Sequence, residues 1–152
     1  MNTTVEGKKI LKIKSLLYDC TNDDVRRIIS KIEDQEVLYM YAYNYNWDNG
    51  FEIPQAIIDN DKCTLSTALL LFYRADGVSY LLEKSFNYNL APWSEFIKKL
   101  YNSILNNKFQ IGEIGFRVQL SKVQLCKLKK VLVKQENIFI ESIEGVNLDI
   151  DL

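Results

Sequence analysis

Apolar residues recur at helical spacing along most of this chain. The segment after Asp34, a suitable N-cap, has one such stripe. The apolar residues on this stripe are Val37, Leu38, Tyr41, Ala42 and Tyr45. The tyrosines at alternate positions from Tyr39 to Tyr45 also fit a strand that ends at the turn before Gly50. We prefer the helix, because Pro54 lies where a partner strand would donate hydrogen bonds.

Capping residues divide the centre of the chain into further helices. Thr21 precedes two aspartates in the first turn of a helix that we expect to pack antiparallel on the next one. Pro54 suits the first turn of a short helix that ends at Asp59, because its missing N–H would be unpaired there in any case. Thr64 caps the most apolar helix, and Gly77 is expected to end it in a left-handed conformation.

The second half of the chain predicts two more helices and a small β element. One helix begins near Pro92, and another follows Ser121 with its lysines facing outward. The residues of the second helix expected to face inward are Val123, Leu125, Leu128, Val131 and Leu132. Phe116, Val118 and Leu120 alternate with polar residues, as strand residues do. Ile138, Ile140 and Ile143 are expected to pair with them, and the last acidic residues to fray.

The predicted fold class is therefore mainly α. We expect about six helices stacked in antiparallel pairs, with at most a small two-stranded β element near the C-terminus. A chain of 152 residues with 47% hydrophobic content is long enough for one core and too short to expect two. We therefore expect a single domain over residues 1–152, of which the polar residues 1–14 are loosely ordered.

Composition excludes several kinds of catalytic site. The chain has no histidine, which excludes Ser-His-Asp and Cys-His nucleophiles and histidine-ligated metals. Its three cysteines, Cys20, Cys63 and Cys126, are widely spaced, which favours reduced thiols over a zinc site or a disulfide framework. No cofactor motif is present, so we expect a protein that is not an enzyme and that binds no cofactor.

The same features limit the partners and the location. The net charge of −1 gives no reason to expect a nucleic-acid partner. No apolar run of about 18 residues would span a bilayer. The basic N-terminus lacks the apolar region and cleavage site of a secretory signal. We therefore expect a cytoplasmic location and no membrane partner.

One stretch of the chain combines aromatic and acidic residues. Tyrosine and tryptophan are favoured in protein interfaces, and carboxylates steer a partner and fix its register. The residues expected to form a partner-binding surface are Tyr43, Trp47, Asp48, Glu52, Asp59 and Asp61. Asn44, Asn46 and Asp48 imitate the start of a calcium loop, but the positions that require glycine and glutamate are Asn49 and Gln55. We therefore expect no metal there and predict instead that the Asn and Asp side chains bond to local backbone.

Two alternative functions stay open. The carboxylates of Asp48, Glu52, Asp59 and Asp61 suit the oxygen ligands of a small metal-dependent hydrolase. Alternatively, Tyr39 and Tyr43 lie off the predicted buried stripe, and exposed aromatic residues of this kind suit a homodimeric scaffold.

The centre of the chain also carries a family signature. It consists of N-Y-N-W-D-N-G-F-E-I-P at residues 44–54, C-T-L-S-T-A-L at 63–69 and F-Y-R-A-D-G at 72–77. Over roughly residues 36–84 the chain resembles an uncharacterised bacterial domain family with the signature N-W-D-G-F-x-x-P and C-x-L-x-T-A-L. Its members resemble small, acidic, cytoplasmic proteins encoded beside polymorphic and contact-dependent toxins. The resemblance implies an immunity protein that neutralises a cognate toxin domain. The acidic stretch suits the basic cleft of a nuclease toxin, and we expect a monomer or weak homodimer.

Overall fold

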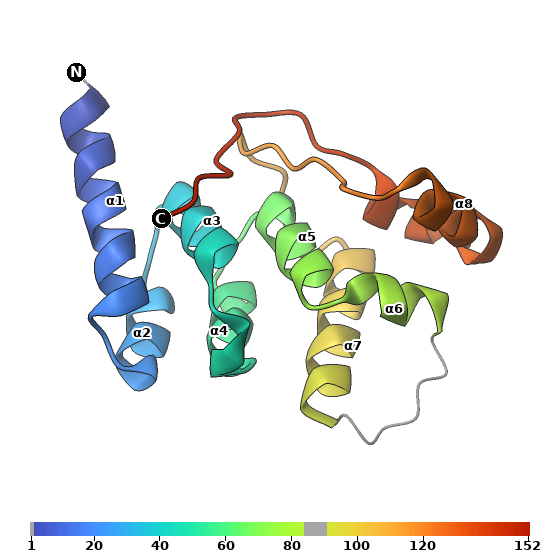
Figure 1. Ribbon diagram of the computed structural model, residues 1–152, viewed down its shortest axis with the longest axis horizontal. Helices are drawn as coiled ribbons and strands as arrows, with labels where there is room; N and C mark the ends of the chain where they lie inside the picture. The colour runs from blue at the N-terminus through green and yellow to red at the C-terminus, as the bar shows by residue number, and fades with distance from the viewer. Residues whose placement is uncertain (1, 84–90) are drawn as a thin grey trace. The chain divides into compact units, whose positions relative to one another are not determined.

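The computed structural model describes residues 2–83 and 91–152 (Figure 1), and these form two compact units. Unit 1 comprises Met1–Cys63 and Leu148–Leu152, and unit 2 comprises Thr64–Asn147. The helices of unit 1 are α1 (Asn2–Tyr18), α2 (Asn22–Ile29), α3 (Gln35–Asn44), the 3-10 helix η1 (Trp47–Asn49) and α4 (Glu52–Asp59). Those of unit 2 are α5 (Leu65–Arg74), α6 (Gly77–Leu82), α7 (Ala91–Leu105), α8 (Lys122–Val131) and the 3-10 helix η3 (Lys134–Ile140). The single domain expected over residues 1–152 stays a prediction, because two compact units can belong to one domain.

The mainly helical class is confirmed, but the predicted helix count and β element are wrong. The described residues contain eight α-helices and two 3-10 helices, and they contain no strand. Phe116 and Ile143 do pair, each N–H donating to the other carbonyl over 2.8 Å, but only as an isolated antiparallel bridge. Ile138 and Ile140 lie in η3 instead, where Phe139 between them is fully buried. The alternation of these isoleucines therefore did not mark a strand.

Helix α1 includes residues 2–14, which were expected to be loosely ordered, and continues to Tyr18. It packs on α3 and buries Ile13 and Leu16. Lys9 Nζ lies 3.0 Å from a carboxylate oxygen of Asp34 and 3.0 Å from one of Glu36. These hydrogen bonds, first to Asp34 and then to Glu36, raise the pKa of the Lys9 ammonium. The looseness expected of residues 1–14 concerns their motion and stays a prediction.

Helix α3 confirms the helical prediction and excludes the strand. Its N-cap is Asp34, whose carboxylate accepts the N–H of Glu36 at 2.9 Å. The helix is buried on more than the predicted stripe, since Tyr39 is only 1% exposed. The Tyr39 hydroxyl donates to Asp149 Oδ1 at 2.5 Å. The prediction that Tyr39 is an exposed aromatic residue of a homodimer surface is therefore wrong.

Helices α2 and α4 pack on each other. Thr21 caps α2 as predicted and accepts the N–H of Asp24 at 3.2 Å. The main contact of α2 is with α4, not with the next helix α3 as expected. The buried side chain of Asn60 explains part of this arrangement, because its amide donates to the carbonyls of Ile29 and Ile32 at 2.9 and 2.8 Å. This amide joins the end of α4 to the end of α2.

Helix α5 is the apolar helix predicted in unit 2. Thr64 caps it, and it packs on α6 and α7. The left-handed residue at its end is Asp76, with a φ of 62°, and not Gly77 as predicted. Gly77 is needed for a different reason, because a Cβ there would lie 2.2 Å from ring atoms of Phe72. Glycine thus permits close packing of α6 on α5.

An aromatic cluster organises the core of unit 2. The ring of Phe139 lies 4.7 Å from that of Phe72 and 5.2 Å from that of Tyr101, on which it stacks. The Tyr101 hydroxyl donates to Glu136 Oε2 at 2.5 Å, and the N–H of Val133 donates to Oε1 at 2.9 Å. The Glu136 carboxylate is 1% exposed, and these donors offset part of its desolvation. No spacing pattern in the sequence predicts these contacts.

Helix α8 is far less buried than predicted. Ser121 and Gln124 form a capping box at its start, as the Ser121 cap leads one to expect. Of its five residues expected to face inward, only Leu128 is buried, while Val123 is 64% and Val131 47% exposed. Helix α8 packs on the short helix α6, which covers only a narrow part of the surface of α8.

We expect Leu69→Ala to destabilise the protein by about 2 to 5 kcal/mol, because Leu69 is fully buried on α5 and its truncation leaves a cavity. The matched control is Leu11→Ala, since Leu11 is 68% exposed and should change the free energy of unfolding by less than about 0.5 kcal/mol. Urea unfolding measures both. Equal effects at the two positions would contradict the burial described for α5.

We also expect stability to fall between about pH 10 and pH 12. Burial raises the pKa of Tyr73 to about 12, and its hydroxyl donates to the carbonyl of Phe139 at 2.6 Å. The unfolded chain then loses this proton near pH 10 while the folded protein keeps it, so the stabilisation is complete below pH 10 and disappears through pH 12. Urea unfolding of Tyr73→Phe should show a weaker decline over this range than the wild type. An unchanged decline would contradict the burial of this phenol.

Candidate functional site

The candidate site lies where α3 ends and α4 begins. Between them η1 is capped by Asn46, whose Oδ1 accepts the N–H of Asp48 at 3.0 Å. Gly50 follows with a φ of 87°, the positive value predicted for it. The Asn46 side chain therefore serves as a local backbone cap, as predicted. The Asp48 carboxylate, in contrast, is on an exposed residue.

Trp47 belongs to a small aromatic cluster at this site. Its ring lies 5.2 Å from that of Tyr45 and 6.0 Å from that of Phe51, both in edge-on geometry. The Tyr45 hydroxyl donates to the carbonyl of Gly50 at 2.7 Å. Burial, with a smaller effect from the charge of Glu52, raises the pKa of Tyr45 to about 12. The half-buried Trp47 ring is thus held between two aromatic neighbours.

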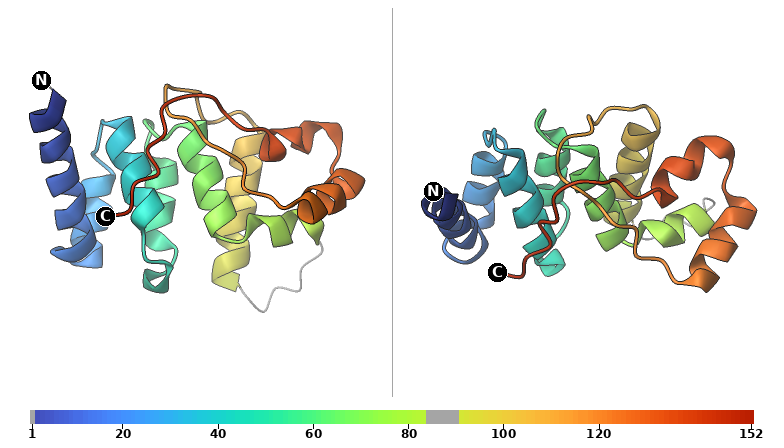
Figure 2. Two further views of the ribbon diagram at one scale, coloured as in Figure 1. Left: turned by 45° about the horizontal axis from the view of Figure 1, so that its top comes forward. Right: turned by 90° about the horizontal axis from the view of Figure 1, so that it is seen from above.

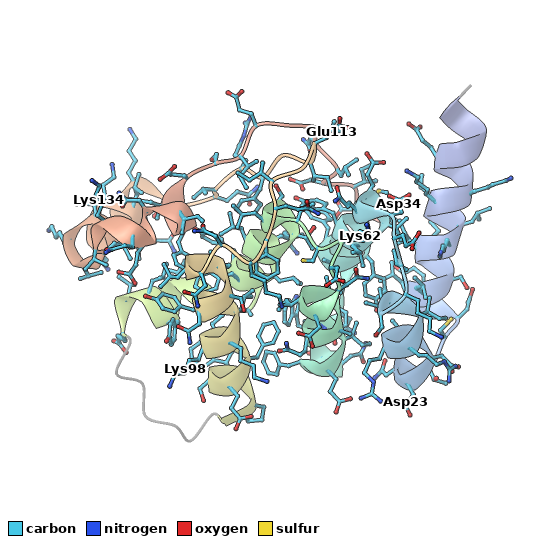
Figure 3. All side chains as sticks on the ribbon, turned by 180° about the vertical axis from the view of Figure 1, so that it is seen from behind. Asp23, Asp34, Lys62, Lys98, Glu113 and Lys134 are labelled. Carbon is cyan, nitrogen blue, oxygen red and sulfur yellow. The ribbon has the colours of Figure 1, made fainter. Side chains whose placement is uncertain are left out.

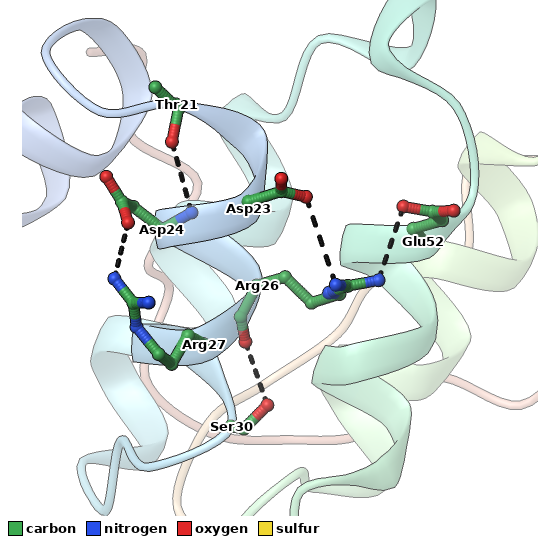
Figure 4. A network of polar contacts seen from close by, with 7 residues as sticks. All are labelled: Thr21, Asp23, Asp24, Arg26, Arg27, Ser30 and Glu52. Carbon is green, nitrogen blue, oxygen red and sulfur yellow. Dashed lines mark hydrogen bonds and ion pairs between the residues drawn. The ribbon is translucent and has the colours of Figure 1, made fainter.

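Glu52 stands at the first position of α4 and joins a polar network with α2 (Figure 4). Arg26 Nη1 lies 3.5 Å from Glu52 Oε2, and Nη2 of the same arginine lies 3.9 Å from Asp23. Arg27 pairs with Asp24 on the same helix. The Glu52 side chain is 77% exposed, so its ion pair contributes about 1 kcal/mol or less to stability. Glu52 is available to a partner at little cost to the fold.

Asp59 and Asp61 lie at the other end of α4. Asp59 ends the helix and accepts a hydrogen bond from Gln55 Nε2 at 3.0 Å, and Asp61 follows the helix as an exposed residue. A helix rises about 1.5 Å per residue, so Glu52 and Asp59 are about 10 Å apart along its axis. The six predicted residues therefore form two groups. Tyr43, near the end of α3, is half-buried and is close to Trp47, Asp48 and Glu52 in the sequence.

The distance between Glu52 and Asp59 bears on the alternative that this protein is a metal-dependent hydrolase. Oxygen ligands lie about 2 to 2.6 Å from a bound Mg²⁺ or Ca²⁺ ion, so carboxylates at opposite ends of α4 cannot share one. In the described parts of the chain, no group of three or more cysteine, aspartate or glutamate side chains has a geometry that could hold a metal ion.

The two units carry opposite net charges. Unit 1 has thirteen acidic and eight basic side chains, a net charge of −5, while unit 2 has seven acidic and eleven basic ones, a net charge of +4. Figure 3 marks Asp23 and Asp34 in unit 1 and Lys134 in unit 2. The predicted binding residues all belong to the acidic unit.

Sequence reasoning missed three long-range hydrogen bonds beside this site. The closing segment Leu148–Leu152, expected to fray, lies on α3 and places Asp149 against the hydroxyl of Tyr39. Asn44 binds the backbone of the same segment. More than 100 residues separate Asn44 from Ile150, and no spacing pattern relates them.

Comparison with protein families matches the centre of the chain to a family model. No curated protein and no solved structure matches the chain. Within the described residues, no helix is both long enough and apolar enough to cross a membrane. Residues 33–105 match the family model described as Domain of unknown function (DUF4274), a range from the residue before the Asp34 cap of α3 to the end of α7. A DUF4274 domain, from a family without an assigned function, thus covers residues 33–105.

Proposed function

We propose that this protein is a non-catalytic, cytoplasmic immunity protein that binds and neutralises a cognate bacterial toxin domain. Its binding surface is the group formed by Tyr43, Trp47, Asp48 and Glu52 at the junction of α3, η1 and α4. The observation that carries the proposal is the packed Trp47 ring in a short stretch that also holds two exposed acidic residues, Asp48 and Glu52, on a unit with a net charge of −5.

This combination suits strong protein binding. Tight interfaces concentrate their energy in a few aromatic anchors that lose water on binding, and Trp47 is held in place before the partner arrives. Complementary charge accelerates encounter and fixes register. An acidic surface is complementary to the basic cleft with which a nuclease binds phosphates, so a nuclease toxin is the partner that this charge favours.

Co-expression with the toxin encoded beside the gene tests the proposal. We expect the protein to restore growth to cells that produce the toxin and to co-purify with it at a defined stoichiometry. Failure of both rescue and co-purification would refute the immunity role. Rescue without co-purification would contradict neutralisation by direct binding.

We expect Asp48→Lys together with Glu52→Lys to weaken toxin binding by several kcal/mol, because both reversals place like charge against a basic partner. The free energy of unfolding should change by only about 1 kcal/mol, since both residues are exposed and the ion pair of Glu52 with Arg26 is weak. Isothermal titration calorimetry and urea unfolding measure the two quantities.

The matched control is Glu141→Lys together with Glu144→Lys, which alters the net charge equally at exposed residues of unit 2. This control should bind the toxin with nearly wild-type affinity. If the Asp48 and Glu52 reversals leave affinity intact but strongly destabilise the protein, these residues are structural caps, and the binding face must be sought on the basic segment Lys122–Lys134.

A further inference from the structure

One side chain of α3 binds the backbone of the closing segment Leu148–Leu152. Asn44 Nδ2 donates to the carbonyl of Ile150 at 2.8 Å, and Asn44 Oδ1 accepts the N–H of Leu152 at 2.7 Å. In both views of Figure 2 the segment runs beside α3. The Asn44 amide thus binds a backbone carbonyl and a backbone N–H that lie two residues apart. Any peptide segment with this backbone conformation presents the same two groups.

The Asn44 amide is also fixed by its own helix. Its Nδ2 donates a second hydrogen bond, 2.8 Å long, to the carbonyl of Met40 one turn earlier in α3. This bond holds one N–H and leaves the other N–H and the oxygen for the segment. A side chain oriented in advance loses little conformational entropy when it binds a peptide.

Two side chains of the segment add selectivity. Leu148 is 9% exposed, and Asp149 accepts the Tyr39 hydroxyl at 2.5 Å. The N–H of Ile150 donates to the carbonyl of Leu148 at 2.8 Å, which makes a γ-turn with Asp149 at its tip. The site therefore accepts an apolar residue followed by a carboxylate, and after that it contacts mainly backbone.

Most residues of the segment Leu148–Leu152 are exposed to solvent. Asp149 and Asp151 are exposed, and Ile150 is 40% exposed. The two aspartates supply two of the negative charges in the net charge of −5 of unit 1, whose other residues already sum to −3. Few buried contacts and exposed backbone hydrogen bonds are typical of segments that open locally at low cost in free energy.

We infer that α3 carries a binding site for a short peptide segment with an apolar residue followed by aspartate or glutamate, and that Leu148–Leu152 occupies this site in cis. The ligand is a partner protein that presents such a segment and displaces the chain's own. The inference does not depend on the proposed function, because it concerns Tyr39 and Asn44 and its test requires no toxin.

A labelled peptide tests the site directly. Fluorescence anisotropy would follow fluorescein-labelled Asn-Leu-Asp-Ile-Asp-Leu, the sequence of residues 147–152, as it binds to full-length protein. In the wild type the tethered segment competes at an effective concentration in the millimolar range. Leu148→Ser together with Asp149→Ser weakens this competitor, so the double variant should bind the peptide at least tenfold more tightly than the wild type.

Two further variants identify the residues responsible. Asn44→Ala in the double variant should abolish binding, because both hydrogen bonds to the peptide backbone are lost. Tyr39→Phe keeps the ring packed and removes only the hydroxyl, so it should weaken binding about tenfold. A scrambled peptide of the same composition is the control and should not bind.

Three results would overturn the inference. The first is a folded double variant, with wild-type circular dichroism and cooperative urea unfolding, that binds the peptide no more tightly than the wild type. The second is loss of the fold in the double variant, because the segment would then be a fixed part of unit 1. The third is equal binding of the native and scrambled peptides.

Discussion

The burial of the middle of α3 is the constraint on which unit 1 depends. Six of its ten residues are buried, so each polar group on this helix must find a partner within the protein. Asp34 caps its start, Tyr39 donates to Asp149, and Asn44 binds the closing segment. Just past its end, Tyr45 donates to the carbonyl of Gly50 and fixes the turn that presents Trp47. The candidate surface is thus a consequence of how the end of a buried helix satisfies its polar groups.

Local chemistry made most helix starts predictable from the sequence. Thr21, Asp34, Thr64 and Ser121 all cap helices as expected, because an N-cap depends only on residues within one turn. Gly50 has the predicted positive φ for the same local reason. The group around Trp47 was also predictable, since its members come from one short stretch.

Contacts between distant segments were not predictable in this way. The alternating isoleucines around Phe139 indicated a strand, but stacking on Tyr101 and the bonds to Glu136 select a 3-10 helix. The spacing of apolar residues in α8 indicated a broad buried face. The helix that packs on α8 is α6, which is only six residues long and buries little of that face. The contact of Asn44 with the closing segment spans more than 100 residues and leaves no pattern in the sequence.

The central claim is that unit 1 binds a toxin through the junction of α3, η1 and α4. Hydrogen exchange with and without the cognate toxin, read by mass spectrometry, tests it most directly, because it locates the contact without altering the chain. The account predicts slower exchange in residues 43–52 when the toxin is bound, with little change in α8. Slower exchange confined to α8, with residues 43–52 unaffected, would contradict it.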